Sequence, residues 1–133
     1  MRKNIINLSL IVVNIFFLLY YSFQLLIFTD EFAMKNIGFF NHAIAGLLEI
    51  IGIIFLSLAI GLIFIFFKGV TNQLPLLITI FLMQIIISLN FWRYVLTDSP
   101  GETDINTIIL HALIFSISSF SMLILLFRQK KDL

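Results

Sequence analysis

Four long apolar segments, separated by short polar stretches, dominate the pattern of hydrophobic and polar positions along the chain. A helix that crosses the hydrocarbon core of a bilayer needs about 20 apolar residues, and every segment reaches that length. None of them alternates between apolar and polar residues, as a strand of a membrane barrel would. The pattern therefore predicts four transmembrane helices, at about residues 5–28, 38–67, 74–96 and 105–127.

The short connections between these helices predict how they are arranged. They favour a single domain, an all-α, antiparallel, up-and-down bundle of four transmembrane helices. Polar residues at the connections agree with the predicted ends. Asn72 can cap the third helix with Pro75 in its first turn, and Thr103 or Asp104 can cap the fourth.

A weak internal repeat bears on where the second helix begins. Residues 23–30 read FQLLIFTD and residues 91–98 read FWRYVLTD. This repeat would match Asn36 to Asp104 and so suggests that the second helix begins before His42, nearer Asn36 than its apolar run alone indicates. We therefore predict a start at about residue 38. Chance similarity in so apolar a sequence is an equally good explanation.

Composition and charge place the chain in a membrane and set its orientation. Hydrophobic residues make up 61% and charged residues 11% of the chain, whereas soluble proteins average about 45–50% and 25%. Basic residues are enriched on the cytoplasmic side of membrane proteins, so both termini are expected to be cytoplasmic. The bias rests on Arg2, Lys3, Lys68, Arg128, Lys130 and Lys131 on one side, against Lys35 and Arg93 on the other. The abundance of Ile, Phe, Leu and Asn further suggests a bacterial cytoplasmic membrane.

The same numbers exclude several function classes. A net charge of +1 argues against a nucleic-acid partner, and the expected partners are the lipid bilayer and a homo-oligomer or a larger membrane complex. Without cysteine the chain has no disulfide and no thiol nucleophile. His42 and Glu49 lie ~10.5 Å apart along a helix axis, too far for one metal site. No cofactor or metal is expected, and the serines between 116 and 121 are interpreted as helix-packing residues.

Glu49 is the only carboxylate well inside one of the apolar segments. Burying such a group in a membrane costs roughly 2.5 to 3.5 kcal/mol, so it usually faces protein and marks a functional or packing site. At the helical rise per residue, Glu49 lies ~28 Å from Lys68 and His111 ~25 Å from Arg128. Similar counting predicts a polar layer in the outer half of the bundle, either a closed hydrogen-bond network or a ligand pocket. Its candidate residues are Tyr21, Gln24, Glu49, Asn90, Arg93 and His111.

Helical spacing predicts which way these side chains face. On the second predicted helix, residues spaced alternately by four and three form one face, which we call the seam and which we expect to contact a neighbouring helix. The seam includes Glu49 and consists of Ala45, Glu49, Gly52, Leu56 and Ala59. Gln84 and Ser88 lie roughly opposite Arg93 on the third helix. Either Arg93 extends outward to the headgroups, or one of the two faces is buried by oligomerisation.

The second predicted helix carries a resemblance to a known family. Gly46, Glu49 and Gly52 match the Gly-x-x-Glu-x-x-Gly pattern of small DoxX-like four-helix membrane proteins, and residues 40–127 resemble these proteins as a whole. The chain departs from the family in having His111 where an acidic residue is often seen. The resemblance implies four helices and a small accessory or binding role, because some members are linked to quinone-coupled oxidation or to membrane-protein assembly.

Three hypotheses for function follow. The first is a non-catalytic, DoxX-like inner-membrane protein, which binds a small ligand or serves as an accessory subunit through the polar layer. The second is a proton-coupled transporter or channel that acts as a dimer through Glu49. A lipid-modifying enzyme is third, because a single buried acid and base do not supply a catalytic geometry.

Overall fold

The chain is mainly α-helical in a computed structural model, which describes residues 5–70, 72–98, 101 and 103–130. These helices are α1 (Ile5–Leu26), α2 (Thr29–Asn36), α3 (His42–Lys68), α4 (Leu74–Leu96) and α5 (Ile105–Lys130). The four longer ones are long and apolar enough to cross a membrane, which makes the chain a multi-pass membrane protein. Arg2, Lys3 and Lys131, on which the predicted orientation partly rests, lie outside the described residues, as do Ser99, Pro100 and Glu102.

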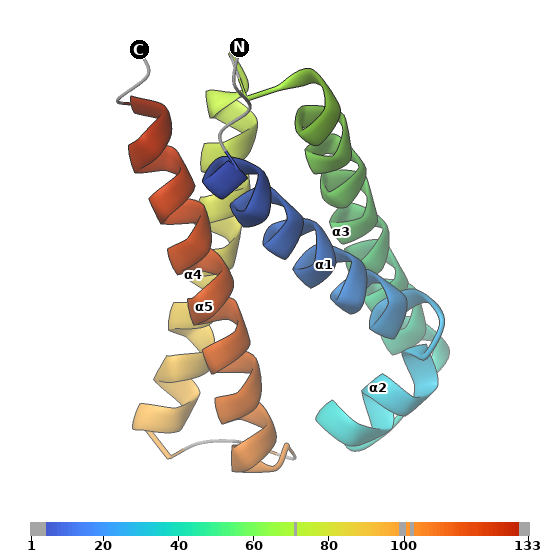
Figure 1. Ribbon diagram of the computed structural model, residues 1–133. Coiled ribbons are helices and arrows are strands. Elements are labelled where there is room, and N and C mark those ends of the chain that lie inside the picture. Colours follow the sequence, from blue (N-terminus) through green and yellow to red (C-terminus); the bar gives the residue numbers. More distant parts are fainter. Residues whose placement is uncertain (1–4, 71, 99–100, 102, 131–133) are drawn as a thin grey trace.

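The helices form two pairs, α1 with α3 and α4 with α5, and the two pairs meet mainly through α1 and α5 (Figure 1). The start of α1, the end of α5 and the connection from α3 to α4 lie at one end of the molecule. The short helix α2 and the connection from α4 to α5 lie at the other end, where the two pairs diverge.

Local sequence explains most of the helix ends. The side chain of Asn41 accepts a hydrogen bond from the Ile44 N–H at 2.9 Å and caps α3. Asp104 accepts from the Thr107 N–H at 3.2 Å, so the predicted cap of the last helix is confirmed. Two predictions at helix starts are wrong: α4 follows Gln73 rather than a capping Asn72, and α3 begins at His42 rather than near residue 38.

The residues ahead of α3 form a separate helix, α2, that the apolar pattern did not predict. Its eight residues are mostly polar, with Asp30 and Glu31 in the first turn and Lys35 in the last. Acidic residues at the start and basic residues at the end complement the helix dipole. A separate helix here lets the chain turn between α1 and α3, and it brings Asn36 toward the gap between the helix pairs.

A small residue lets α1 and α3 approach closely. A Cβ atom on Gly52 would lie 2.8 Å from Leu26 Cγ and 3.0 Å from Leu25 Cβ. The buried positions of α3 include Leu48, Gly52, Phe55, Ala59 and Leu62. The predicted seam therefore has the right small residues, Gly52 and Ala59, but its other members are displaced by one residue, about 100° around the helix.

Three side-chain hydrogen bonds join α1 to α5 at three levels. Asn7 Oδ1 accepts from Arg128 Nε at 2.7 Å, Asn14 Nδ2 donates to Ser121 Oγ at 2.8 Å, and the Tyr21 hydroxyl lies 2.6 Å from His111 Nδ1. The α1 residues are seven apart, so they lie on one face of the helix. Their partners follow in reverse order along α5.

Aromatic rings fill the core between the four long helices. The Phe115 ring of α5 packs at its centre, 4.9 Å from the rings of both Phe17 and Tyr21 on α1. Phe55 of α3 and Phe91 of α4 lie 6.5 Å and 5.8 Å from it, centroid to centroid. This cluster brings together at least one ring from each long helix. It lies about one helical turn from His111, toward the C-terminal end of α5.

Candidate functional site

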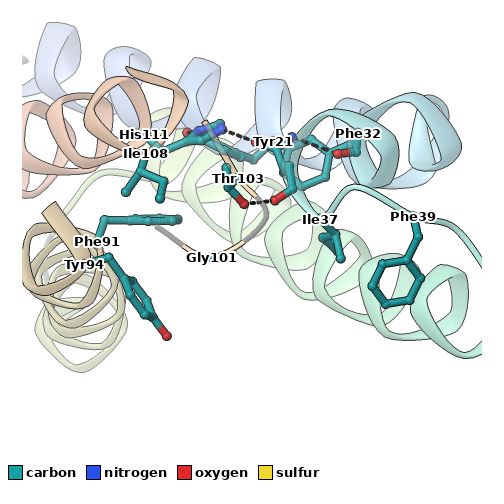
Figure 2. Close-up of a pocket in the computed structure, with 11 residues that line it drawn as sticks. Tyr21, Phe32, Ile37, Phe39, Phe91, Tyr94, Gly101, Thr103, Ile108 and His111 are labelled. Carbon is teal, nitrogen blue, oxygen red and sulfur yellow. Dashed lines mark hydrogen bonds between the residues drawn. The ribbon is translucent and has the colours of Figure 1, made fainter. Parts of the chain in front are cut away.

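A cavity of about 540 Å³ lies at the end of the molecule where α2 and the α4–α5 connection meet. Its walls come from α1, α2, α4, α5 and the segments that follow α2 and α4 (Figure 2). Most of the lining is apolar or aromatic, which is typical of sites that bind small molecules. Phe39, Tyr94 and Gly101 are exposed, so the cavity reaches the surface of the protein. The lining residues are Tyr21, Phe32, Asn36, Ile37, Phe39, Phe91, Tyr94, Gly101, Thr103, Ile108 and His111.

One wall of the cavity carries a chain of hydrogen-bonded side chains. The Tyr21 hydroxyl lies 2.6 Å from His111 Nδ1, and His111 Nε2 lies 2.9 Å from Asn36 Oδ1. The Asn36 amide nitrogen donates in turn to the Phe32 carbonyl at 2.8 Å. The Thr103 hydroxyl donates to the main-chain carbonyl of Asn36. These bonds connect α1, α5, α2 and the segment ahead of α5 around a single histidine (Figure 2).

Aromatic rings hold the His111 imidazole in place. The Phe91 ring stacks on it with a centroid distance of 5.7 Å and an interplanar angle of 26°. Phe32 and Tyr21 flank it at 6.0 Å and 5.7 Å. A ring enclosed in this way and hydrogen-bonded at both nitrogens has little freedom to rotate. The polar wall of the cavity is therefore preorganised.

Two of the six predicted polar-layer residues meet at this cavity. Tyr21 and His111 are hydrogen-bonded, and both line it. Arg93 is exposed on α4, where its guanidinium carbon lies 4.7 Å from the ring centroid of Tyr94, a lining residue. Asn90 is exposed and Gln24 is half-buried, and neither belongs to the cavity lining.

The expectation that Glu49 faces protein is wrong. Its side chain is exposed and forms no hydrogen bond or ion pair with any of the described residues. The buried seam of α3 passes through the preceding residue, Leu48, which turns the carboxylate away from α1. Along the helix axis Glu49 lies ~28 Å from Lys68, which is close to the hydrocarbon thickness of about 30 Å. If Lys68 lies at one boundary of the membrane, Glu49 therefore lies near the opposite boundary.

Sequence reasoning missed the members of the site that come from α2 and its surroundings. Asn36 supplies the acceptor for His111, and Phe32 and Thr103 complete this side of the cavity. All three lie outside the four apolar segments, so their sequence gives no sign that they are buried in a membrane protein. The dipole-matched charges of residues 29–36 were the available signal for a helix at this position.

A second polar cluster lies deeper between α1, α4 and α5. Gln84 Nε2 donates to Asn14 Oδ1 at 2.8 Å, and Asn14 Nδ2 donates both to Ser121 and to the Leu10 carbonyl. Asn14 and Gln84 are completely buried, and Gln84 Oε1 accepts no hydrogen bond from the described residues. Gln84 and Ser88 thus face the core of the chain, whereas Arg93 is exposed. The two opposite faces of α4 are therefore accommodated within one chain, with Arg93 on the outer face.

The chemistry available at the cavity is hydrogen bonding and apolar contact. Within the described part of the chain, His, Cys, Asp and Glu form no cluster of three that could hold a metal ion. The serines of α5 bond mainly to carbonyls one turn back, as Ser116 does to Ala112 and Ser119 to Ser116. Ser116 also accepts from Trp92 Nε1 at 3.0 Å, so this serine helps to pack α4 on α5. Comparison of the chain with protein-family models, with characterised proteins and with solved structures finds no match.

Proposed function

We propose that the protein is a non-catalytic, small-ligand-binding membrane protein, and that its ligand occupies the cavity between the two helix pairs. The observation that carries this proposal is an aromatic cavity of about 540 Å³ with one preorganised polar wall. A binding site of this kind combines apolar surface for affinity with a few fixed polar groups for orientation. An accessory subunit that presents a bound lipophilic molecule to a larger complex uses the same features.

The proposal includes a placement in the membrane. The four long helices run antiparallel, up and down, with both termini in the cytoplasm of a bacterium, as the distribution of basic residues supports. The cavity then lies in the outer half of the membrane, near the headgroups. The DoxX-like pattern at Gly46, Glu49 and Gly52 supports the same class of small four-helix protein. The exposed position of Glu49 removes the main support for proton-coupled transport through that residue.

The proposal is tested by ligand binding to the protein in lipid nanodiscs. The probe is 2-naphthalenemethanol, a compact arene with one polar group, distributed by equilibrium dialysis between protein-containing and empty nanodiscs. Empty discs correct for partition into lipid. We expect a saturable excess in the protein-containing discs, and equal partition into the two kinds of disc would contradict the proposal.

Two adjacent phenylalanines provide a matched pair of variants. Phe39 lines the cavity and is 53% exposed, whereas Phe40 is 44% exposed and does not line it. An aromatic contact contributes about 0.5–1.5 kcal/mol, so Phe39→Ala is expected to weaken binding about 2- to 10-fold. Phe40→Ala should leave the affinity unchanged. Equal effects of the two substitutions would place the bound probe elsewhere on the protein.

A further inference from the structure

The direction of each hydrogen bond in the polar wall follows from the Asn36 amide. Its nitrogen donates to the Phe32 carbonyl, so its oxygen is the atom that faces His111 Nε2. An amide oxygen only accepts, so Nε2 must carry the proton. In a neutral imidazole the other nitrogen is then an acceptor. His111 Nδ1 therefore accepts the proton of the Tyr21 hydroxyl, 2.6 Å away.

This direction leaves the wall with more unused acceptors than unused donors. The hydroxyl protons of Tyr21 and Thr103 are donated within the wall, to His111 and to the Asn36 carbonyl. Their oxygens keep free lone pairs, and so does Asn36 Oδ1. The one remaining donor among these groups is the second N–H of the Asn36 amide. The polar wall thus offers a ligand mainly hydrogen-bond acceptors, whereas the Tyr94 hydroxyl, which lines the cavity outside this wall, can both donate and accept.

The surroundings of the cavity favour the same kind of ligand. The faces of aromatic rings carry negative potential, and four aromatic residues besides Tyr21 line the cavity. They are Phe32, Phe39, Phe91 and Tyr94. Acidic residues also outnumber basic ones in the described segments at this end of the protein, with Asp30, Glu31, Asp98 and Asp104 against Lys35 and Arg93. A carboxylate ligand would meet unfavourable electrostatics here.

We infer that the cavity selects apolar molecules whose polar group is a hydrogen-bond donor, a hydroxyl or an amino group, over matched molecules that only accept. This inference rests on the proposed binding function and specifies the chemistry of its ligand. The donor group lies against Tyr21 and Thr103, and the apolar body lies among the aromatic rings. A ketone, an ether or a carboxylate of the same shape leaves those acceptors without a partner.

The test is a series of four ligands with one naphthyl body, measured on the unmodified protein in nanodiscs. The alcohol is 2-naphthalenemethanol, its methyl ether only accepts, 2-methylnaphthalene has no polar group, and 2-naphthylmethylamine donates as an ammonium ion. One hydrogen bond contributes about 0.5–1.5 kcal/mol, so the alcohol is expected to bind about 2- to 10-fold more tightly than the ether. Comparison of the amine with the alcohol distinguishes a charged donor from a neutral one. Tighter binding of the alcohol or of the amine than of the ether supports the inference.

Two variants connect the preference to the polar wall. Tyr21→Phe alone would expose His111 Nδ1 as a new acceptor, because Tyr21 is its donor. The variant therefore combines Tyr21→Phe with His111→Phe, and the ratio of alcohol affinity to ether affinity should fall toward that given by the remaining groups of the wall. Tyr20→Phe is the matched control, because Tyr20 is exposed and does not line the cavity. An ether that binds as tightly as the alcohol to the unmodified protein would overturn the inference while leaving the binding function intact. The absence of saturable binding by all four compounds would instead overturn the proposed function itself.

Discussion

Two glycines in α3 allow the contact between α1 and α3 to be tested in isolation. Gly46 and Gly52 lie in the same helix, six residues apart. A Cβ atom on Gly46 would have no heavy atom within 4 Å, whereas one on Gly52 would lie 2.8 Å from Leu26 Cγ. Replacing each by alanine therefore compares the same chemical change in open and in crowded surroundings.

The expected magnitudes follow from two opposing effects. Alanine stabilises a helix by roughly 0.5–1 kcal/mol relative to glycine, and this gain applies to both positions. At Gly52 the new methyl group also forces α1 and α3 apart, because Leu25 Cβ lies 3.0 Å away and is fixed to the backbone. Overpacking of this kind costs about 1–3 kcal/mol. We expect Gly46→Ala to be more stable than the unmodified protein and Gly52→Ala to be less stable than Gly46→Ala by about 1–3 kcal/mol.

The assay is reversible unfolding in mixed micelles of a mild detergent and sodium dodecyl sulfate, followed by circular dichroism. The free energy of unfolding is compared between the two variants, so effects of the detergent on helix propensity cancel. Equal stability of the two variants would refute the close approach of α1 and α3 at Gly52. A Gly52→Ala protein more stable than Gly46→Ala would refute the packing described for this helix pair.

The polar and aromatic contacts between helices give two further predictions. Asn14→Leu and Gln84→Leu should each destabilise the protein, because each leaves buried polar atoms without a partner. The double variant should lose less than the sum of the two, by about 0.6 kcal/mol and by no more than about 1.7 kcal/mol, the average and upper bound for such pairs in membranes. Strict additivity in the same unfolding assay would contradict the hydrogen bond between them. Phe115→Ala should cost about 3–5 kcal/mol, because this ring contacts rings of the other three long helices. Phe120→Ala, at a residue 63% exposed on the same helix, should change stability by less than about 0.5 kcal/mol, and comparable losses at the two positions would contradict the aromatic core.

Helix positions were predictable from the sequence because the length of an apolar run is set by the membrane. The predicted range 74–96 coincides with α4, and the other long helices differ from prediction by a few residues at their ends. The face that α3 buries was not predictable in the same way. Spacings of four and three allow two neighbouring seams, and Gly52 and Ala59 belong to both. Bulky Leu48 and Phe55 fill the contact with α1, and Glu49 is left outside.

The candidate site was predictable only in part, and for a physical reason. Counting residues along straight helices places groups at equal depth, which brought Tyr21 and His111 to the same level before any contact was known. Depth does not specify direction, so Asn90 at that level and Arg93 about one turn beyond it are both exposed. The contribution of Asn36 depends on a short polar helix, whose position is set by tertiary contacts rather than by its own sequence pattern.

The hydrogen bond between Tyr21 and His111 has two roles that the other α1–α5 bonds do not share. Asn7 with Arg128 and Asn14 with Ser121 only join the helix pairs, since none of these residues lines the cavity. Tyr21 and His111 join the pairs and also form the cavity wall. A ligand that donates to a lone pair of the Tyr21 oxygen does not displace the hydroxyl proton, which Tyr21 still donates to His111 Nδ1. Ligand binding and helix pairing therefore do not compete. The separation between α1 and α5 at this level thus sets the shape of the site, and a ligand that fits it stabilises the contact between the two helix pairs.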